Sequence, residues 1–247
     1  MNETGCELLI LVPIYKRELN LLEQFSVDYL RTKVSNRKIC FVAPEGLDKS
    51  YYLKRYGEFN YCLFEDKYFI SIDGYNQLLL SVDFYERFED YSHILIHQTD
   101  ALLFKDDLDM WMASGYSYLG APWPNGMSLN FKSDENSEGS FKTLTSYVGN
   151  GGFSMRSIKA SLMLIKDNPS LHMYWKMNKY NEDCFFSFGR YFSEKYFVPE
   201  SEQAAFFSME MDPSGYFNKT HKTVPTGCHA WWKYDLPFWQ NIISMVG

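Results

Sequence analysis

Short apolar runs alternate with helical stretches through the first half of the chain. Four of these runs are expected to be strands: residues 8–15, 38–43, 61–64 and 93–97. Strands that alternate with helices form βαβ units, so the pattern predicts an α/β, Rossmann-like fold with a mostly parallel sheet flanked by helices. Ligands bind at the carboxyl ends of such strands. Residues 13–15, 44–46 and 98–100 should therefore converge on one crevice.

Other segments complete this expectation. Apolar residues recur at helical spacing from Tyr75 to Phe88, with Asp73 placed to cap the helix. The polar residues 125–146 predict a long surface loop, and such loops often close over active sites. Further strands are expected at 116–121 and 152–155, and further helices near 158–166, 182–191 and 201–209. No repeat or linker divides the chain, which predicts a single domain over residues 1–247.

Composition narrows the class of protein. The net charge of −7, with 24 basic and 31 acidic residues, argues against nucleic acid as the main partner, because phosphate binding needs clustered cations. The 46% of hydrophobic and 18% of aromatic residues indicate a packed globular protein. The five cysteines show no metal-binding spacing, no secretion signal is visible, and the longest apolar runs are far shorter than the roughly 20 residues that span a bilayer. We therefore expect a cytoplasmic protein.

Asp100 is the first candidate for chemistry, since it follows a buried strand at the ligand edge of the sheet. A carboxylate there can hold Mg²⁺ or Mn²⁺, which prefer oxygen ligands and can bridge two phosphates. It can equally cap the turn that follows. An Asp-x-Asp sequence also occurs at Asp107 and Asp109, but there it begins an expected helix, where acidic residues are favoured by the helix dipole.

Residues 149–154 place three glycines beside an expected strand. Glycine weakens strand pairing, so either a ligand approaches the backbone closely or the segment forms a bulge or a turn. The spacing matches neither a P-loop nor a dinucleotide-binding fingerprint, which argues against ATP and NAD.

Three later residues carry further alternatives. Glu182 and Asp183 begin an expected helix, where acidic residues commonly act as caps, yet one of them could serve as a general base. His229 lies beside Trp231 in an irregular stretch, and it is either structural or a ligand that joins a carboxylate at a metal. The neighbouring rings either stack on a sugar or pack in the core.

In this order the patches resemble the GT-A class of nucleotide-sugar glycosyltransferases, which has an Asp-x-Asp motif, a glycine-rich loop, a Glu-Asp motif and a carboxy-terminal histidine. More closely, five segments resemble a bacterial family of unassigned function that is grouped with predicted glycosyltransferases of surface-polysaccharide assembly. These segments are residues 98–104, 118–123, 149–156, 181–183 and 227–231. The resemblance spans nearly the whole chain.

The resemblance implies a role for each matching residue. Asp100 and His229 would hold Mn²⁺ or Mg²⁺, and Asp183 would be the catalytic base, with Glu182 as its rival. The nucleotide would lie against Pro13, Ile14, Tyr15, Gln98 and Thr99. The sugar or acceptor would lie against Trp123, Asn150, Gly151, Gly152 and Trp231. Gln98 stands where the motif has its first aspartate, so one carboxylate fewer would contact the ion.

The implied activity is transfer of a sugar from a nucleotide-diphosphate donor, such as a UDP-sugar, to a hydroxyl of a glycan or lipid-linked acceptor. We expect an inverting reaction, although a retaining enzyme could use the same scaffold. Peripheral contact with the inner face of the cell membrane, through Trp231, Trp232, Phe238 and Trp239, is part of this expectation. Two alternatives stay open: a sugar-phosphate nucleotidyltransferase, whose glycine-rich loop after the first strand is missing here, and a catalytically silent carbohydrate- or nucleotide-binding module.

Overall fold

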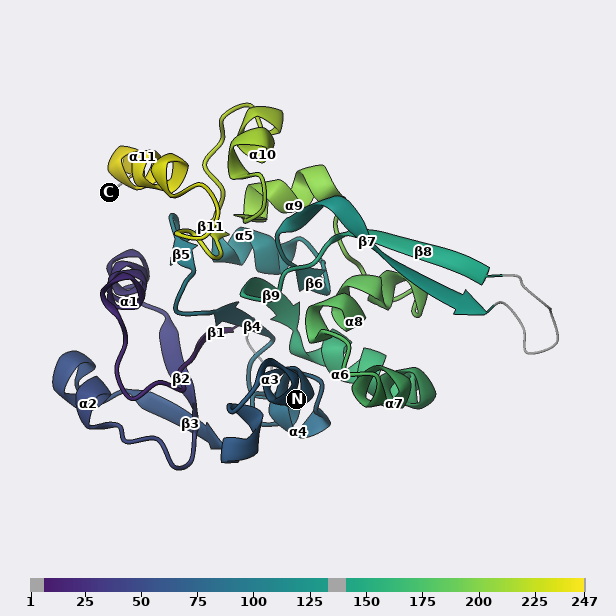
Figure 1. Cartoon of the computed structure of the whole chain (residues 1–247), viewed down its shortest axis with the longest axis horizontal. Helices are drawn as coiled ribbons and strands as arrows, with labels where there is room; N and C mark the ends of the chain where they lie inside the picture. Colours follow the sequence, from purple (N-terminus) through teal and green to yellow (C-terminus); the bar gives the residue numbers. More distant parts are fainter. Residues whose placement is uncertain (1–6, 133–140, 247) are drawn as a thin grey trace.

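A six-stranded sheet forms the centre of the computed structural model, which describes residues 7–132 and 141–246 (Figure 1). The strand order is β3-β2-β1-β4-β9-β6, in which β9 is antiparallel to both of its neighbours and the other pairs are parallel. The strands are β1 (Leu8–Pro13), β2 (Lys38–Pro44), β3 (Asn60–Phe64), β4 (His93–His97), β6 (Tyr118–Leu119) and β9 (Phe153–Ser157). The α/β class expected from the sequence is confirmed.

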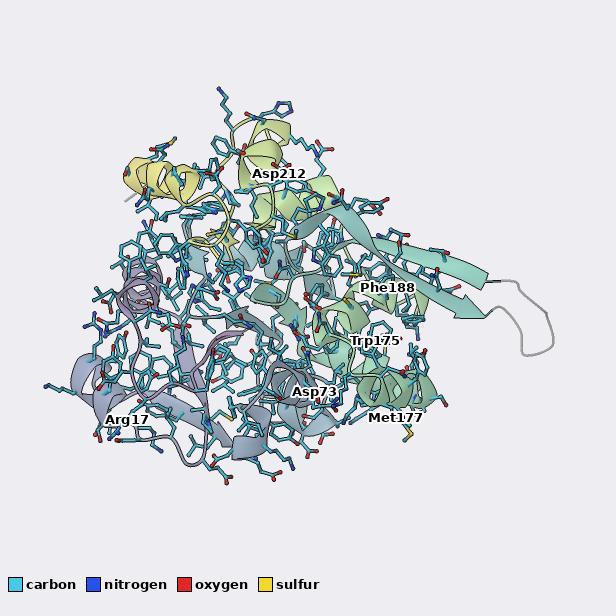
Figure 2. All side chains as sticks on the ribbon, viewed as in Figure 1. Arg17, Asp73, Trp175, Met177, Phe188 and Asp212 are labelled. Atoms are coloured by element: carbon cyan, nitrogen blue, oxygen red, sulfur yellow. The ribbon has the colours of Figure 1, made fainter. Side chains whose placement is uncertain are left out.

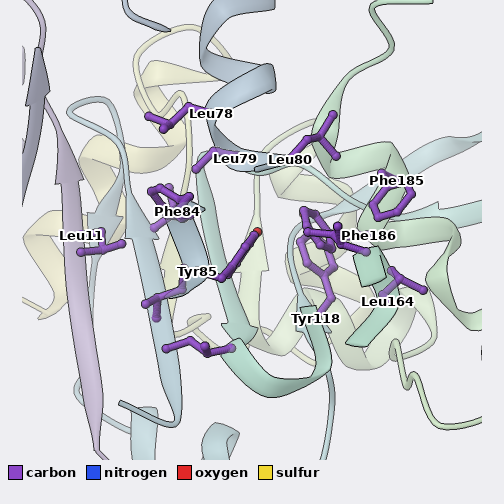
Figure 3. Packing of buried hydrophobic residues seen from close by; sticks show 14 of the residues in the cluster. Leu11, Leu78, Leu79, Leu80, Phe84, Tyr85, Tyr118, Leu164, Phe185 and Phe186 are labelled. Atoms are coloured by element: carbon purple, nitrogen blue, oxygen red, sulfur yellow. The ribbon is translucent and has the colours of Figure 1, made fainter. Parts of the chain in front are cut away.

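Helices cover both faces of this sheet, as the burial of β1 shows. Leu9 and Leu11 belong to one core cluster and Ile10 and Val12 to another, because successive side chains of a strand point to opposite faces. The first cluster is covered by α3 (Ile72–Leu79), α4 (Val82–Glu86), α6 (Ile158–Asp167), α7 (Pro169–Met177) and α8 (Glu182–Phe188), part of which Figure 3 shows. The second is covered by α1 (Leu21–Lys33), α2 (Ser50–Tyr56) and α5 (Leu108–Ala113). An uninterrupted apolar β1 is what burial on two faces requires.

Two strands of the carboxy-terminal third and one from the middle of the chain form a small three-stranded sheet. Its strands are β10 (Ser208–Met209), β11 (Gly227–Cys228) and β5 (Leu102–Leu103), and the nearby helices are α9 (Ser201–Phe207), α10 (Pro213–Lys219) and α11 (Leu236–Val246). Short 3₁₀ turns lie at Asp66–Tyr68 and Gly189–Tyr191. In the described ranges, no helix is both long and apolar enough to cross a membrane. Trp231 and Trp239, which we expected at a membrane surface, are instead buried in the third core cluster.

The helix expected from Tyr75 to Phe88 is in fact two helices, α3 and α4. Ser71 caps α3 by accepting a hydrogen bond from the backbone N–H of Gly74, and Asp73 lies inside its first turn. Ser81 ends this run and caps α4, since its hydroxyl accepts from Phe84 N and donates to Leu78 O. Serine caps of this kind interrupt a helix that the apolar spacing alone would continue.

The prediction of a long surface loop at 125–146 is wrong. Most of this segment belongs to an antiparallel ribbon of β7 (Pro122–Lys132) and β8 (Phe141–Val148), which projects from the body in Figure 1. Residues 133–140 lie outside the described residues. Leu129 is paired with Leu144 and both side chains pack against the main core. The ribbon mixes polar residues such as Asn125, Ser128 and Asn130 with isolated apolar ones, so its sequence resembles a loop.

Candidate functional site

A cavity of about 720 Å³ opens at the carboxyl ends of β1 and β4. Pro13 and Tyr15 contribute to its wall after β1, and residues 98–100 contribute after β4. A smaller adjoining depression shares Tyr15 with the cavity and adds Pro44 and Gly46. The predicted convergence on one crevice is therefore confirmed for residues 13–15 and 98–100, whereas Pro44 and Gly46 line the adjoining depression and not the cavity. All three strand ends lie at the same edge of the sheet, as parallel pairing requires.

His229 lies at the centre of a charged cluster in this cavity. Its Nε2 atom is 3.0 Å from Asp100 Oδ1 and 3.1 Å from Gln98 Oε1, and its Nδ1 atom is 2.8 Å from Glu210 Oε2. Burial by itself would lower the pKa of His229, but the nearby carboxylates of Glu210 and Asp100 outweigh burial and raise it to about 10. At neutral pH the ring is an imidazolium that donates a proton on each side.

Asp100 is shared between His229 and Lys233, whose Nζ atom is 2.7 Å from Asp100 Oδ2. Burial opposes ionisation of Asp100, yet the hydrogen bonds and charges of these two partners hold its pKa well below the usual range. The carboxylate is therefore ionised and already paired with cations. Lys233 is half exposed, so an incoming anion can recruit its ammonium group.

The donor set at Asp100 fits a small divalent cation. Oxygen atoms of Asp100 and Gln98 and the Nε2 atom of His229 converge, and Glu210 holds the other ring nitrogen, as carboxylates do behind metal-ligating histidines. Binding would require loss of the Nε2 proton. Within the described ranges, no three or more His, Cys, Asp or Glu side chains form a ready-made metal site. Such a site would thus depend on an additional anionic ligand, for which a diphosphate is suited.

The glycine-rich segment is pressed between side chains of the site. A Cβ atom on Gly152 would lie 2.2 Å from His229 Nε2, and one on Gly151 would lie 2.5 Å from Glu182 Oε1. On Gly149 it would lie 1.9 Å from the Trp123 ring. These glycines are required by the packing of the protein itself, while Gly151, Gly152 and Asn150 also line the cavity. Neither a simple turn nor a ligand floor alone accounts for the segment.

The two adjacent carboxylates at the start of α8 have different environments. Both oxygens of Glu182 accept hydrogen bonds from Arg156, at 2.7 and 2.9 Å, and the Arg156 side chain is fully buried. Asp183 accepts instead from two backbone N–H groups, those of Gly151 and Cys184, at 3.3 and 2.7 Å. Burial raises the pKa of Asp183, although these N–H groups oppose the shift. Glu182 is thereby committed to its ion pair, and Asp183 remains available at the cavity wall.

Three residues expected to touch ligand do not line the cavity. Ile14 points into the core on the same face of the sheet as Val12, since side chains two apart in a strand share a face. Trp123 packs over Gly149, and Trp231 donates from its Nε1 to Ser26 Oγ inside the core. Their neighbour Trp232 lines the cavity in place of Trp231, and it meets that buried ring edge-on.

Several residues of the site carry no local pattern that would have identified them. Glu210 and Lys233 reach the cluster from separate segments, one after β10 and one before α11. Asn76 joins two helices, because it donates to Asn181 Oδ1 and accepts from Glu182 N. Lys16 pairs with the buried Glu23 at the cavity wall. Of these residues, only Lys233 has a sequence signal, since it follows His229 and two tryptophans within five positions.

Asp107 and Asp109, expected as helix caps, lie away from the cavity. Asp107 is at the N-cap position of α5, but its carboxylate accepts from Thr226 Oγ1 at 2.6 Å and does not cap the helix. Asp109 lies in the first turn of α5 and pairs with Arg37 at 3.0 Å. The Asp-x-Asp sequence here is thus structural.

The charged cluster predicts a pH dependence of stability. A group whose pKa rises on folding stabilises the protein below its unfolded value and loses this contribution as the pH rises through its folded value. The pKa of His229 rises from 6.5 to about 10. Its contribution to the free energy of unfolding is therefore complete below pH 6.5 and declines toward pH 10. In urea titrations, wild-type protein should therefore lose more of its free energy of unfolding across this window than His229→Gln. Parallel curves for the two proteins would contradict the charged cluster.

Comparison with known proteins assigns a fold and a family to this geometry. A crystal structure of the galactosyltransferase LgtC in complex with donor and acceptor sugar analogues matches with a TM-score of 0.55 and 14% identity, over 90% of this chain and 86% of that chain. An active-site mutant of LgtC matches with the same values. This likeness shows that the chain has the fold of a GT-A glycosyltransferase. No curated protein sequence matches the chain. A family model described as "Protein of unknown function (DUF5672)" matches residues 58–229, and the chain therefore belongs to that family.

Proposed function

We propose that the chain is a glycosyltransferase that moves a sugar from a UDP-sugar to a hydroxyl group of a glycan or a lipid-linked glycan. One observation carries the proposal. One cavity, at the ligand edge of a fold shared with LgtC, brings the paired charges of Asp100, His229 and Lys233 together with the available carboxylate of Asp183. The first feature suits a diphosphate leaving group and the second suits an acceptor hydroxyl. Sugar transfer is the reaction that needs both.

The donor would lie against the side of the cavity nearest β1 and β4. Pro13, Tyr15 and Thr99 line this side, next to the smaller depression, in which the base of the nucleotide would lie. Lys16 and Lys233 flank Asp100 and present partly exposed ammonium groups to the diphosphate. A divalent cation held by Asp100 and His229 would stabilise the charge that develops on the leaving nucleoside diphosphate. The lysines would supply part of the same stabilisation.

The acceptor would lie at the other side, where Asp183 and Asn181 line the wall. Two backbone N–H groups orient the carboxylate of Asp183, so an oxygen can accept the proton of an attacking hydroxyl. Its raised pKa makes it a better base than an exposed aspartate. Attack with the help of one base, on the face opposite to the leaving group, inverts the anomeric carbon. We therefore propose an inverting enzyme, and the anomeric configuration of the product, measured by NMR, tests this part separately.

A second candidate is a silent module that binds sugar nucleotides without turnover. The salt bridge between Asp100 and Lys233 favours it, because the carboxylate is already neutralised. Both candidates share the donor site and differ in the role of Asp183.

For the active enzyme, the sequence resemblance suggests a role in bacterial surface-polysaccharide synthesis.

Thermal stability in the presence of nucleotides tests the donor site. A ligand at 100 times its dissociation constant stabilises the native state by about 2.7 kcal/mol, so one nucleoside diphosphate with Mn²⁺ should raise the Tm by several degrees. Asp100→Ala should lose the stabilisation by the metal, whereas Asp109→Ala, a matched aspartate outside the cavity, should keep it. A folded wild-type protein that responds to no nucleotide would remove the donor site from this cavity.

A further inference from the structure

A cluster of exposed apolar side chains gathers at the acceptor end of the cavity. It consists of Ile72, Met173, Tyr174, Met177 and Tyr180, which are 79%, 63%, 48%, 76% and 37% exposed. We call these five residues the α7 surface. Scattered apolar residues are common on proteins, but a contiguous group of long apolar side chains marks an interaction site.

Contacts between α3 and the end of α7 place the five residues of the α7 surface on neighbouring segments. The rings of Tyr174 and Tyr180 are 6.0 Å apart. Gln77 of α3 donates to Lys176 O at 3.1 Å, and Lys179 lies 3.8 Å from Asp73, the neighbour of Ile72. These links hold the end of α7 against the start of α3. Figure 2 shows Met177 at the edge of the molecule with Asp73 nearby.

The α7 helix is apolar on two sides, and the side that carries Trp175 is already packed against the core. Trp175 is buried in the main core, where its ring contacts Phe185 and its Nε1 donates to Asn181 O. Met173 and Met177 are four positions apart and share the opposite side. No described residue covers them, since both remain mostly exposed. The core therefore explains one side of α7 and leaves the other without a partner.

The composition of the α7 surface fits a lipid bilayer. Methionine side chains adapt to irregular apolar surroundings, and tyrosine rings favour the boundary between lipid and water. Lys176 and Lys179 lie among these residues, in a chain whose net charge is −7. Basic residues beside an apolar helix face complement anionic headgroups. We propose that the α7 surface docks on a bilayer that carries anionic lipids.

Docking in this way would bring the cavity to the membrane. Ile72 belongs to the α7 surface and also lines the cavity. Asn181, which directly follows Tyr180 of the α7 surface, lines the cavity as well. An acceptor embedded in the bilayer could then reach the side where Asp183 lies. The docking itself does not depend on the proposed transfer activity, so each can fail without the other.

Flotation with phosphatidylcholine vesicles, prepared with and without phosphatidylglycerol, tests the proposal on the whole chain. Wild-type protein should float with the anionic vesicles. Met173→Gln/Met177→Gln keeps helix propensity but removes apolar contact, and it should lower the bound fraction about tenfold. Lys176→Glu/Lys179→Glu should abolish the preference for anionic vesicles. Circular dichroism and Tm of each variant should match the wild type.

Met110→Gln/Met245→Gln is the matched control, because these methionines are 57% and 68% exposed and lie on α5 and α11. The control should bind vesicles like the wild type. An equal loss in the control would assign binding to general apolarity or to α11 and would overturn the proposal. It would also be overturned if wild-type protein stays unbound, or if it forms a dimer that the α7 variant disrupts without any change in vesicle binding.

Discussion

Asp183→Asn is expected to slow sugar transfer by about two to four orders of magnitude while donor binding persists. General-base catalysis contributes about 10²–10⁴-fold to rate, and an asparagine cannot accept the proton of the acceptor hydroxyl. The substitution preserves the size of the side chain, and the amide oxygen can still accept from Gly151 N or Cys184 N. The kcat should therefore fall by about two to four orders of magnitude, with little change in the Tm shift produced by the donor.

Asp90→Asn provides the control for this experiment, since Asp90 is exposed and lies outside the cavity. Its kcat should equal that of the wild type. If Asp183→Asn transfers sugar at the wild-type rate, the base lies elsewhere, and the inverting mechanism loses its support. If the variant no longer responds to the donor, the residue contributes to binding and the assignment of its role is wrong.

Arg156→Met should destabilise the fold strongly. Arg156 and Glu182 form a bidentate pair in which the arginine is fully buried, and Tyr85 accepts a further hydrogen bond from the guanidinium at 3.1 Å. Burial alone would lower the pKa of Arg156, but the charge of Glu182 outweighs burial and raises it. Burial also raises the pKa of Glu182, and the charge and hydrogen bonds of Arg156 oppose that shift. The bidentate geometry is that of an ionised guanidinium–carboxylate pair. Removing one partner of such a pair leaves a buried charge uncompensated and costs about 3–5 kcal/mol.

Urea denaturation measures this loss of free energy of unfolding. Two further variants show whether the loss comes from the buried charge that is left without a partner. Arg156→Met/Glu182→Leu removes both charges and should recover a large part of the lost free energy of unfolding. Arg190→Met breaks the exposed pair with Glu200 and should cost less than about 1 kcal/mol. A loss in Arg156→Met as small as that in Arg190→Met would show that the buried pair does not stabilise the native state.

Much of the fold was predictable because β1, β2 and β4 are buried on both faces. Their apolar runs are uninterrupted, and three of the four expected strands in the first half begin at the predicted residue. The ribbon of β7 and β8 was missed for the opposite reason, since one of its faces meets water. Helix α1 was also missed, although Asn20 and Glu23 form a capping box at its start.

Strand ends predicted part of the cavity lining, and the resemblance to GT-A enzymes pointed to Asp183 and His229, which also line it. Asp100 and Gln98 lie where β4 ends, and the glycines precede β9. Arg156 distinguishes the two adjacent carboxylates, because of these two it pairs with Glu182 alone. It is a single arginine in the short buried strand β9 and has no motif of its own. Trp231 and Trp232 were indistinguishable in sequence, and only packing against Ser26 shows which of them is buried.

Release of the nucleotide product tests the central proposal most directly. Wild-type protein is incubated with UDP-sugars, Mn²⁺ and a panel of glycan and lipid-linked acceptors, and the nucleotide products are separated by chromatography. Sugar transfer predicts that one donor yields a nucleoside diphosphate and a glycosylated acceptor, and that both products are lost in Asp183→Asn. A donor that binds but stays intact with every acceptor would contradict the proposal in favour of a silent binding module. Release of a sugar phosphate, in the presence of pyrophosphate, would contradict it in favour of a nucleotidyltransferase.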